Sequence, residues 1–172
     1  SARYHYWKQQ PYEFLFPLKM AKLCKYADVI LPNISEAAFM TGMPYPGENA
    51  SNECIKDLLL SLAKLGSKKI VITGVESADH KFGFMGYDSE TKEFFEYYTP
   101  KVQMKSHGTG DVFASTFTGA LMNDYNIQDS LKIAADFTKA CINNTYNDPE
   151  AVNYAVNFES EIPYLLKLIR KV

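Results

Sequence analysis

The chain has 172 residues, of which 47% are hydrophobic, so it is long and apolar enough to bury the core of one domain. Its formal net charge is −2 and it has no basic stripe, which argues against nucleic acid as a partner. There is no apolar stretch of membrane-spanning length and no secretory signal at the start, so we expect a cytoplasmic protein without a membrane partner.

The first half of the chain alternates helical and strand patterns. Residues 1–14 show no clean period and are expected to be irregular. The expected elements that follow are a helix over 15–27, a strand over 28–32, a helix capped by Ser35 and stopped by Gly42, a helix over 55–65 and a strand over 69–73. Strand, helix, strand is the pattern of parallel strands that are buried on both faces.

The second half begins with a predicted hairpin, whose arms are residues 81–87 and 92–98 and are rich in aromatic side chains. Three amphipathic helices follow, over about 111–123, 127–146 and 158–171. No internal repeat, low-complexity tract or linker interrupts the sequence, so we expect a single domain. The aromatic stripe of the hairpin is predicted to pack in the sheet rather than to stack on a ligand.

Neither the cysteines nor the histidines have the spacing of a metal site. Cys24, Cys54 and Cys141 each fall in an apolar helical pattern, and we predict buried free thiols in a reducing compartment. The three histidines lie far apart in the sequence and have no close partner spacing.

The most informative segment is the run of five residues 107–111, His-Gly-Thr-Gly-Asp, which precedes an apolar helix. Glycines at 108 and 110 let the backbone bend sharply and lie close to a ligand, and the N–H groups of a helix N-terminus attract phosphate. Asp111 is a candidate general base at the same turn. The segment therefore holds both parts that phosphoryl transfer needs. The alternative is a tight turn in which Asp111 only caps the helix.

Three segments together resemble the ribokinase-like sugar and vitamin kinases. These are residues 108–111 (Gly-Thr-Gly-Asp), residues 30–37 (Ile-Leu-Pro-Asn-x-x-Glu-Ala) and residues 71–74 (Val-Ile-Thr-Gly). The resemblance covers about residues 15–172 and is greatest to the pyridoxal kinases. It implies a three-layer α/β/α fold with a mostly parallel central sheet. The N-terminal strands of that fold are missing here, so we expect one partial domain of this kind.

The resemblance assigns the chemistry to residues 108–111. Asp111 would accept the proton of the substrate hydroxyl as that oxygen attacks the γ-phosphate of ATP. Gly108, Thr109 and Gly110 would form the anion hole for the transferring phosphoryl group. The related hydroxymethylpyrimidine kinases often have cysteine at the position of Asp111, so the aspartate favours a pyridoxal kinase.

The remaining implied residues would bind the nucleotide and its metal ion. Asn33 would lie near the phosphates, and Glu36 would hold the water shell of Mg²⁺. Thr73 and Gly74 would contact ATP phosphate at the end of their strand. The alternatives are a strand-end cap for Asn33, a surface carboxylate for Glu36 and a plain strand end for Thr73. The segment expected to flank the nucleotide carries Val102, Met104 and Lys105.

The expected function is therefore ATP-dependent phosphorylation of the 5′-hydroxymethyl group of pyridoxal, pyridoxine or pyridoxamine, with Mg²⁺. The expected partners are ATP, a vitamin B6 substrate and a second copy of the chain, because a sheet without its neighbouring strands exposes an edge. We expect this chain alone to have little activity, since catalysis of this kind depends on positioning two substrates. The alternatives are a hydroxymethylpyrimidine or sugar kinase of the same superfamily, and a non-catalytic nucleotide-binding or assembly module.

Overall fold

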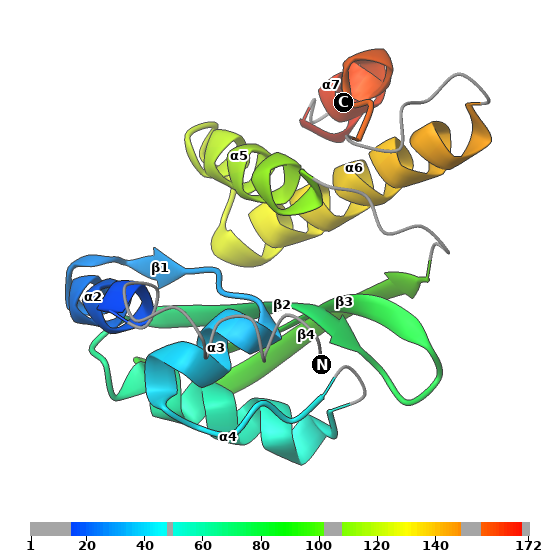
Figure 1. Cartoon of the computed structure of the whole chain (residues 1–172). Helices are drawn as coiled ribbons and strands as arrows, with labels where there is room; N and C mark the ends of the chain where they lie inside the picture. The colour runs from blue at the N-terminus through cyan, green and yellow to red at the C-terminus, as the bar shows by residue number, and fades with distance from the viewer. Residues whose placement is uncertain (1–14, 48–49, 102–107, 149–155, 170–172) are drawn as a thin grey trace. The chain divides into compact units, whose positions relative to one another are not determined.

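A computed structural model describes residues 15–47, 50–101, 108–148 and 156–169 of the chain. The chain divides into two compact units, Ser1–Tyr98 and Thr99–Val172. The first unit holds the sheet and the second holds a group of helices (Figure 1). Each unit is described by itself below.

The sheet has four described strands in the order β1-β2-β3-β4. Their bounds are β1 Val29–Ile30, β2 Lys69–Glu76, β3 Lys81–Asp88 and β4 Glu93–Pro100. β1 pairs with β2 in parallel, as the strand–helix–strand pattern predicts. β2 pairs with β3 antiparallel, a pairing that the sequence did not predict, and β3 and β4, the two arms of the predicted hairpin, are neighbours in the sheet. β3 lies very close to β4, because a Cβ added at Gly83 would come within 1.9 Å of the carbonyl oxygen of Tyr97. Glycine at position 83 therefore lets the two strands approach.

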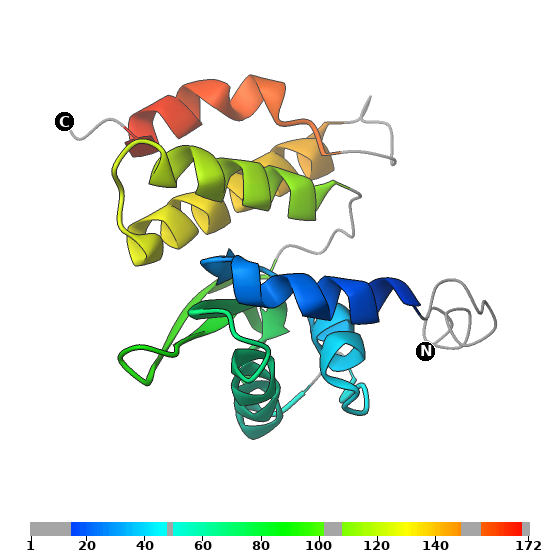
Figure 2. The same ribbon diagram turned by 90° about the vertical axis from the view of Figure 1, so that its left-hand side faces the viewer.

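Two helices of the first unit, α3 Ile34–Thr41 and α4 Asn52–Ala63, pack against this sheet (Figure 2). Before them come α2 Leu15–Leu23, which packs against α3, and the 3₁₀ turn η1 Cys24–Tyr26. The apolar side of α4 is fully buried against β2 and β3, with Ile55, Leu58, Leu59 and Leu62 each at most 1% exposed. These four residues recur at the spacing of one helix face, which is the pattern that predicted the helix.

The second unit contains three helices and a short 3₁₀ turn. They are α5 Thr109–Leu121, α6 Ile127–Asn147, η2 Glu159–Glu161 and α7 Ile162–Ile169. α5 packs against α6, and α7 packs against α6 (Figure 1). Phe137 and Cys141 of α6 are buried here beside Val112 of α5 and Leu165 of α7. The predicted helices are thus present, and the α/β class of the chain is confirmed.

Several details differ from the sequence-based expectations. The first helix ends at Leu23 and tightens into a 3₁₀ turn before residue 27. Helix α3 is capped by Asn33 rather than Ser35, because the side chain of Asn33 accepts the free N–H that a cap must satisfy. Cys54 is exposed in the first turn of α4, so the prediction of burial was wrong for it, while Cys24 and Cys141 are buried free thiols. None of the helices in the described residues combines the length and apolar character that a membrane crossing requires.

Candidate active site

Asn33 and Thr73 lie side by side where β1 ends and β2 continues. The two residues form an isolated parallel bridge, and Thr73 N donates to the carbonyl oxygen of Pro32 at 2.9 Å. The hydroxyl of Thr73 also lies 3.5 Å from that carbonyl oxygen. In open α/β sheets, ligands bind outside the carboxyl ends of the parallel strands. The first unit therefore brings together two residues that were predicted to bind the nucleotide, near the carboxyl ends of the parallel strands β1 and β2.

Glu36 joins this pair through a reciprocal cap of helix α3. Glu36 N donates to Asn33 Oδ1 at 2.9 Å, and Asn33 N donates to Glu36 Oε2 at 2.9 Å. Two backbone N–H groups that the helix start leaves unpaired are thus satisfied. The cap proposed as the alternative role of Asn33 is present, and both side chains remain exposed. The cap fixes the Glu36 carboxylate beside Asn33, just after the end of β1.

Gly74 makes a bulge in β2 immediately after Thr73. Thr73 pairs with Phe84 and Val75 pairs with Gly83, so Gly74 is an extra residue in the register, and its φ is +74°. The strand therefore continues past Gly74 to Glu76 instead of ending there. A bulge of this kind re-aims the side chains that follow it and is common beside active sites. Glycine adopts the required left-handed backbone without strain.

The predicted catalytic segment forms the start of helix α5 in the second unit. Gly108 is the N-cap residue with φ +84°, and the helix runs from Thr109, so Asp111 is its third residue and not its cap. No side chain caps this helix start, whereas Asn33, Ser51 and Asn126 each cap theirs. The N-cap residue Gly108 therefore supplies no side-chain partner for the first N–H groups of α5.

The glycines of this segment leave room at the helix start. A Cβ added at Gly108 or Gly110 would meet no described atom within 4 Å. Gly108 needs its left-handed backbone, but Gly110 has an ordinary helical one, in which glycine costs about 1 kcal/mol relative to alanine. Neither the backbone nor a described neighbour demands glycine at position 110. A group that comes close to the N–H groups, such as a phosphate, would explain it.

The predicted site residues thus fall into two groups. Asn33, Glu36, Thr73 and Gly74 gather at the sheet edge of the first unit, and residues 108–111 begin α5 in the second unit. Val102, Met104 and Lys105 lie outside the described residues. The described residues contain no cluster of three or more His, Cys, Asp or Glu side chains that could hold a metal. A nucleotide-bound Mg²⁺ needs only one or two protein carboxylates, so Glu36 still fits it.

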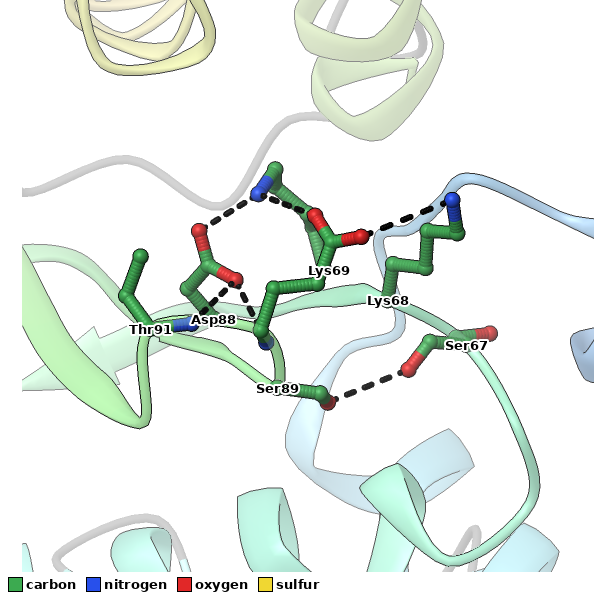
Figure 3. Close-up of polar contacts among 7 residues, drawn as sticks. Ser67, Lys68, Lys69, Asp88, Ser89 and Thr91 are labelled. Carbon is green, nitrogen blue, oxygen red and sulfur yellow. Dashed lines mark hydrogen bonds and ion pairs between the residues drawn. The ribbon is translucent and has the colours of Figure 1, made fainter.

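A separate charged cluster lies at the opposite end of β2 (Figure 3). Lys69 Nζ is paired with Asp88 and lies 3.6 Å from Glu90 Oε2, while Asp88 Oδ1 accepts the N–H groups of Glu90 and Thr91 at 2.9 and 3.3 Å. Burial alone would raise the pKa of Asp88, but Lys69 and the two N–H groups outweigh it and hold the pKa below its ordinary value. The bond to Asp88 raises the pKa of Lys69. Since all of these charges are paired, this cluster stabilises the hairpin and is not a reactive site.

Sequence reasoning missed the polar turn that follows Glu76. The Nδ1 atom of His80 lies 3.0 Å from Glu76 Oε1, beyond Thr73 toward the C-terminal end of β2. A spacing of four residues is not a pattern that indicates a strand, so the sequence did not predict this contact. The strand continues through the bulge at Gly74 beyond its predicted end and therefore includes Glu76. The turn that carries His80 follows directly after it.

Comparison with known proteins relates the chain to a family of kinases. A family model described as phosphomethylpyrimidine kinase matches residues 17–156. The hydroxymethylpyrimidine/phosphomethylpyrimidine kinase of Aquifex aeolicus is 29% identical over 73% of this chain and 47% of its own length. The pyridoxal kinase PdxY of Corynebacterium diphtheriae is 25% identical over 76% of this chain and 45% of its own length.

A solved structure extends the likeness to the fold. The pyridoxal kinase of Lactobacillus plantarum superposes with a TM-score of 0.76 and 27% identity, over 89% of this chain and 54% of that structure. The predicted resemblance and the α/β fold of these kinases are therefore confirmed. The chain spans about half the length of the curated relatives it matches.

Proposed function

The chain belongs to the phosphomethylpyrimidine kinase family, and on that premise we propose that it forms the nucleotide-binding portion of a kinase that transfers a phosphoryl group from ATP to a hydroxymethyl group. The observation that carries the proposal is the start of α5, where Gly-Thr-Gly-Asp leaves the first N–H groups without a side-chain cap and presents an exposed carboxylate.

In the proposed reaction, the substrate oxygen forms a bond to the γ-phosphorus of ATP as the bond from that phosphorus to the β–γ bridging oxygen breaks. ADP leaves with the bridging electron pair, and the hydroxyl proton passes to the Asp111 carboxylate. The N–H groups at Gly108, Thr109 and Gly110 stabilise the charge on the transferring group. Asp111 lies in the first turn of α5, so it is close to those N–H groups.

At the sheet edge, the proposed role of Thr73 and Gly74 is to bind nucleotide phosphate, and that of Asn33 is to lie beside it. Glu36 would hold water of a Mg²⁺ ion, which when bound neutralises phosphate charge. The capping bonds support this, because they fix the carboxylate and the amide in one geometry before any ligand arrives. Val102, Met104 and Lys105 are proposed to flank the nucleotide.

For the acceptor we propose a vitamin B6 compound, phosphorylated at its 5′-hydroxymethyl group. Asp111 supports this choice over a pyrimidine, by the family pattern described above. The second candidate is a hydroxymethylpyrimidine, which the description of the matching family and the Aquifex aeolicus relative favour. Turnover of each acceptor by the complete kinase would distinguish the two. We further propose a single partial kinase domain that works in the cytoplasm and self-associates.

The proposal is tested by thermal unfolding of the chain with and without Mg·ATP, in the wild type and in Gly110→Asp. A ligand that binds only the folded state raises the melting temperature. The variant places bulk and negative charge among the N–H groups and should abolish the rise. Gly119→Asp is the matched control, because Gly119 lies farther along the same helix and its Cβ would also meet no described atom within 4 Å.

A rise that survives in Gly119→Asp and vanishes in Gly110→Asp supports the proposed site. An equal rise in all three proteins would show that the nucleotide binds elsewhere. No rise in the wild type would reject nucleotide binding by this chain and leave an assembly role. A rise without phosphorylation of either acceptor would favour a non-catalytic nucleotide-binding module.

A further inference from the structure

The turn between β2 and β3, whose place in the chain Figure 1 shows, is held in one conformation by its own hydrogen bonds. Ser77 N donates to the carbonyl oxygen of Lys81 at 2.9 Å, His80 N donates to that of Ser77 at 3.0 Å, and Lys81 N donates to Ser77 Oγ at 3.1 Å. The ammonium of Lys81 also lies 2.6 Å from Asp79 Oδ2. The turn is therefore a fixed platform rather than a loose loop.

His80 has a left-handed backbone in this platform. Its φ is +58°, in a region that residues with a side chain seldom enter, although histidine, like asparagine and aspartate, enters it more often than most. A left-handed backbone costs a residue with a side chain about 1–2 kcal/mol. Strained residues of this kind persist where the surrounding structure fixes them, and they gather at ligand sites.

The imidazole of His80 has one nitrogen held and the other turned away from the protein. Its Nδ1 lies 3.0 Å from Glu76 Oε1, and the Glu76 side chain is 10% exposed whereas the His80 side chain is 86% exposed. An ionised carboxylate only accepts hydrogen bonds, so Nδ1 donates. When the ring is doubly protonated, its Nε2–H is available to an anion. The other charged groups of the turn, Asp79 and Lys81, are paired with each other.

The bulge at Gly74 places this histidine on the face of the sheet that carries Thr73. Ile72 and Val75 both belong to the core that faces α3 and α4. Because side chains alternate along a strand and Gly74 is the extra residue, Thr73 and Glu76 both point to the other face. Three residues of strand span about 10 Å. The phosphates and ribose of one nucleotide cover a distance of this order.

We propose that His80, in its imidazolium form, binds a phosphate group of the nucleotide through Nε2, while Glu76 orients the ring. The proposal rests on the proposed function, because it assigns a further contact to the same nucleotide site. In this arrangement the phosphate and the Glu76 carboxylate would lie on opposite sides of the ring, each accepting a hydrogen bond from one ring nitrogen. Both nitrogens donate only in the imidazolium form, so the contact to phosphate is made at low pH and lost at high pH.

The test is the dissociation constant of Mg·ATP for the chain between pH 5.5 and 8.5, in the wild type and in His80→Asn. Asparagine tolerates the left-handed backbone, so the turn should persist. Lys92→Asn is the matched control, because Lys92 is also left-handed, with φ +62°, but follows β3 at the opposite end of the sheet. Titration of ATP itself affects all three proteins alike and cancels in the ratio of their constants.

We expect His80→Asn to bind Mg·ATP about tenfold more weakly than the wild type at pH 5.5 and about equally at pH 8.5. Lys92→Asn should match the wild type at every pH. A ratio near one at all pH values would overturn the role of His80 and leave the proposed function intact. Absence of Mg·ATP binding by the wild type itself would overturn both.

Discussion

Replacing Glu36 by glutamine separates the two roles proposed for its side chain. The side chain accepts the N–H of Asn33 at 2.9 Å as part of the cap of α3, and it is proposed to hold the water shell of Mg²⁺. Glutamine keeps an oxygen that can accept the same N–H, since both residues serve in capping boxes. It removes the negative charge on which attraction for a cation depends. Alanine removes the cap bond as well.

The expected stability losses are small and ordered. Glu36→Gln loses the favourable interaction of a carboxylate with the helix N-terminus, about 0.5 kcal/mol. Glu36→Ala also loses one net hydrogen bond, about 1 kcal/mol more. For a unit of roughly 100 residues, 1 kcal/mol lowers the melting temperature by about 4–8 °C. We therefore expect a decrease of about 2–4 °C for glutamine and about 6–12 °C for alanine.

The assay is the melting-temperature rise caused by ATP, measured with Mg²⁺ and again with a chelator. With Mg²⁺, Glu36→Gln should bind ATP about tenfold more weakly, which is about 1.4 kcal/mol. Without Mg²⁺ the same variant should bind ATP at least as well as the wild type, because a carboxylate that repels phosphate has been removed. If glutamine changes ATP binding equally in both conditions, Glu36 is a helix cap and has no role toward the metal.

Three further predictions concern the fold. Gly83→Ala should destabilise the chain by at least about 2 kcal/mol in denaturant unfolding, because its Cβ would collide with a backbone carbonyl. The control Gly119→Ala, on the open face of α5, should stabilise the chain by up to about 1 kcal/mol. Equal effects of the two substitutions would contradict the close packing of β3 and β4. Because the pKa of Asp88 is held below its ordinary value, its contribution to stability is present above about pH 4 and is lost as the pH falls further. In Asp88→Asn the free energy of unfolding should therefore fall less steeply with pH below about pH 4 than in the wild type. A thiol reagent should label only Cys54 quickly in the native chain, and rapid labelling of a second thiol would contradict the burial of the other two.

Much of the fold could be predicted from spacing alone. The four apolar residues of α4 repeat at helical intervals, and residues 69–73 form a short apolar run, so one helix and one strand were evident. The cap of α3 was harder, because Asn33 and Ser35 are both good capping residues. Glu36 decides between them, since it lies three residues after Asn33 and can return a hydrogen bond to it.

The candidate site could be predicted only in part. Residues 108–111 could be proposed from the sequence because glycines and an acid before an apolar helix have a chemical meaning in themselves. Cys54 was expected in the core because its neighbours in sequence are apolar, but it lies in the first turn of its helix on the exposed side. The Glu76–His80 pair left no pattern at all, because it depends on one extra residue in a strand.

That extra residue links the core to the candidate site. In a strand without a bulge, Val75 would lie on the same face as Thr73, and the next residue would face the helices. Val75 is fully buried in the core beneath α3 and α4, so a regular strand would remove this valine from that core and turn the charge of Glu76 into it. The left-handed backbone of Gly74 avoids both costs. The same backbone turns Glu76 toward the face of Thr73, and thereby brings His80 there. The packing of the sheet and the geometry proposed for nucleotide binding therefore depend on a single glycine.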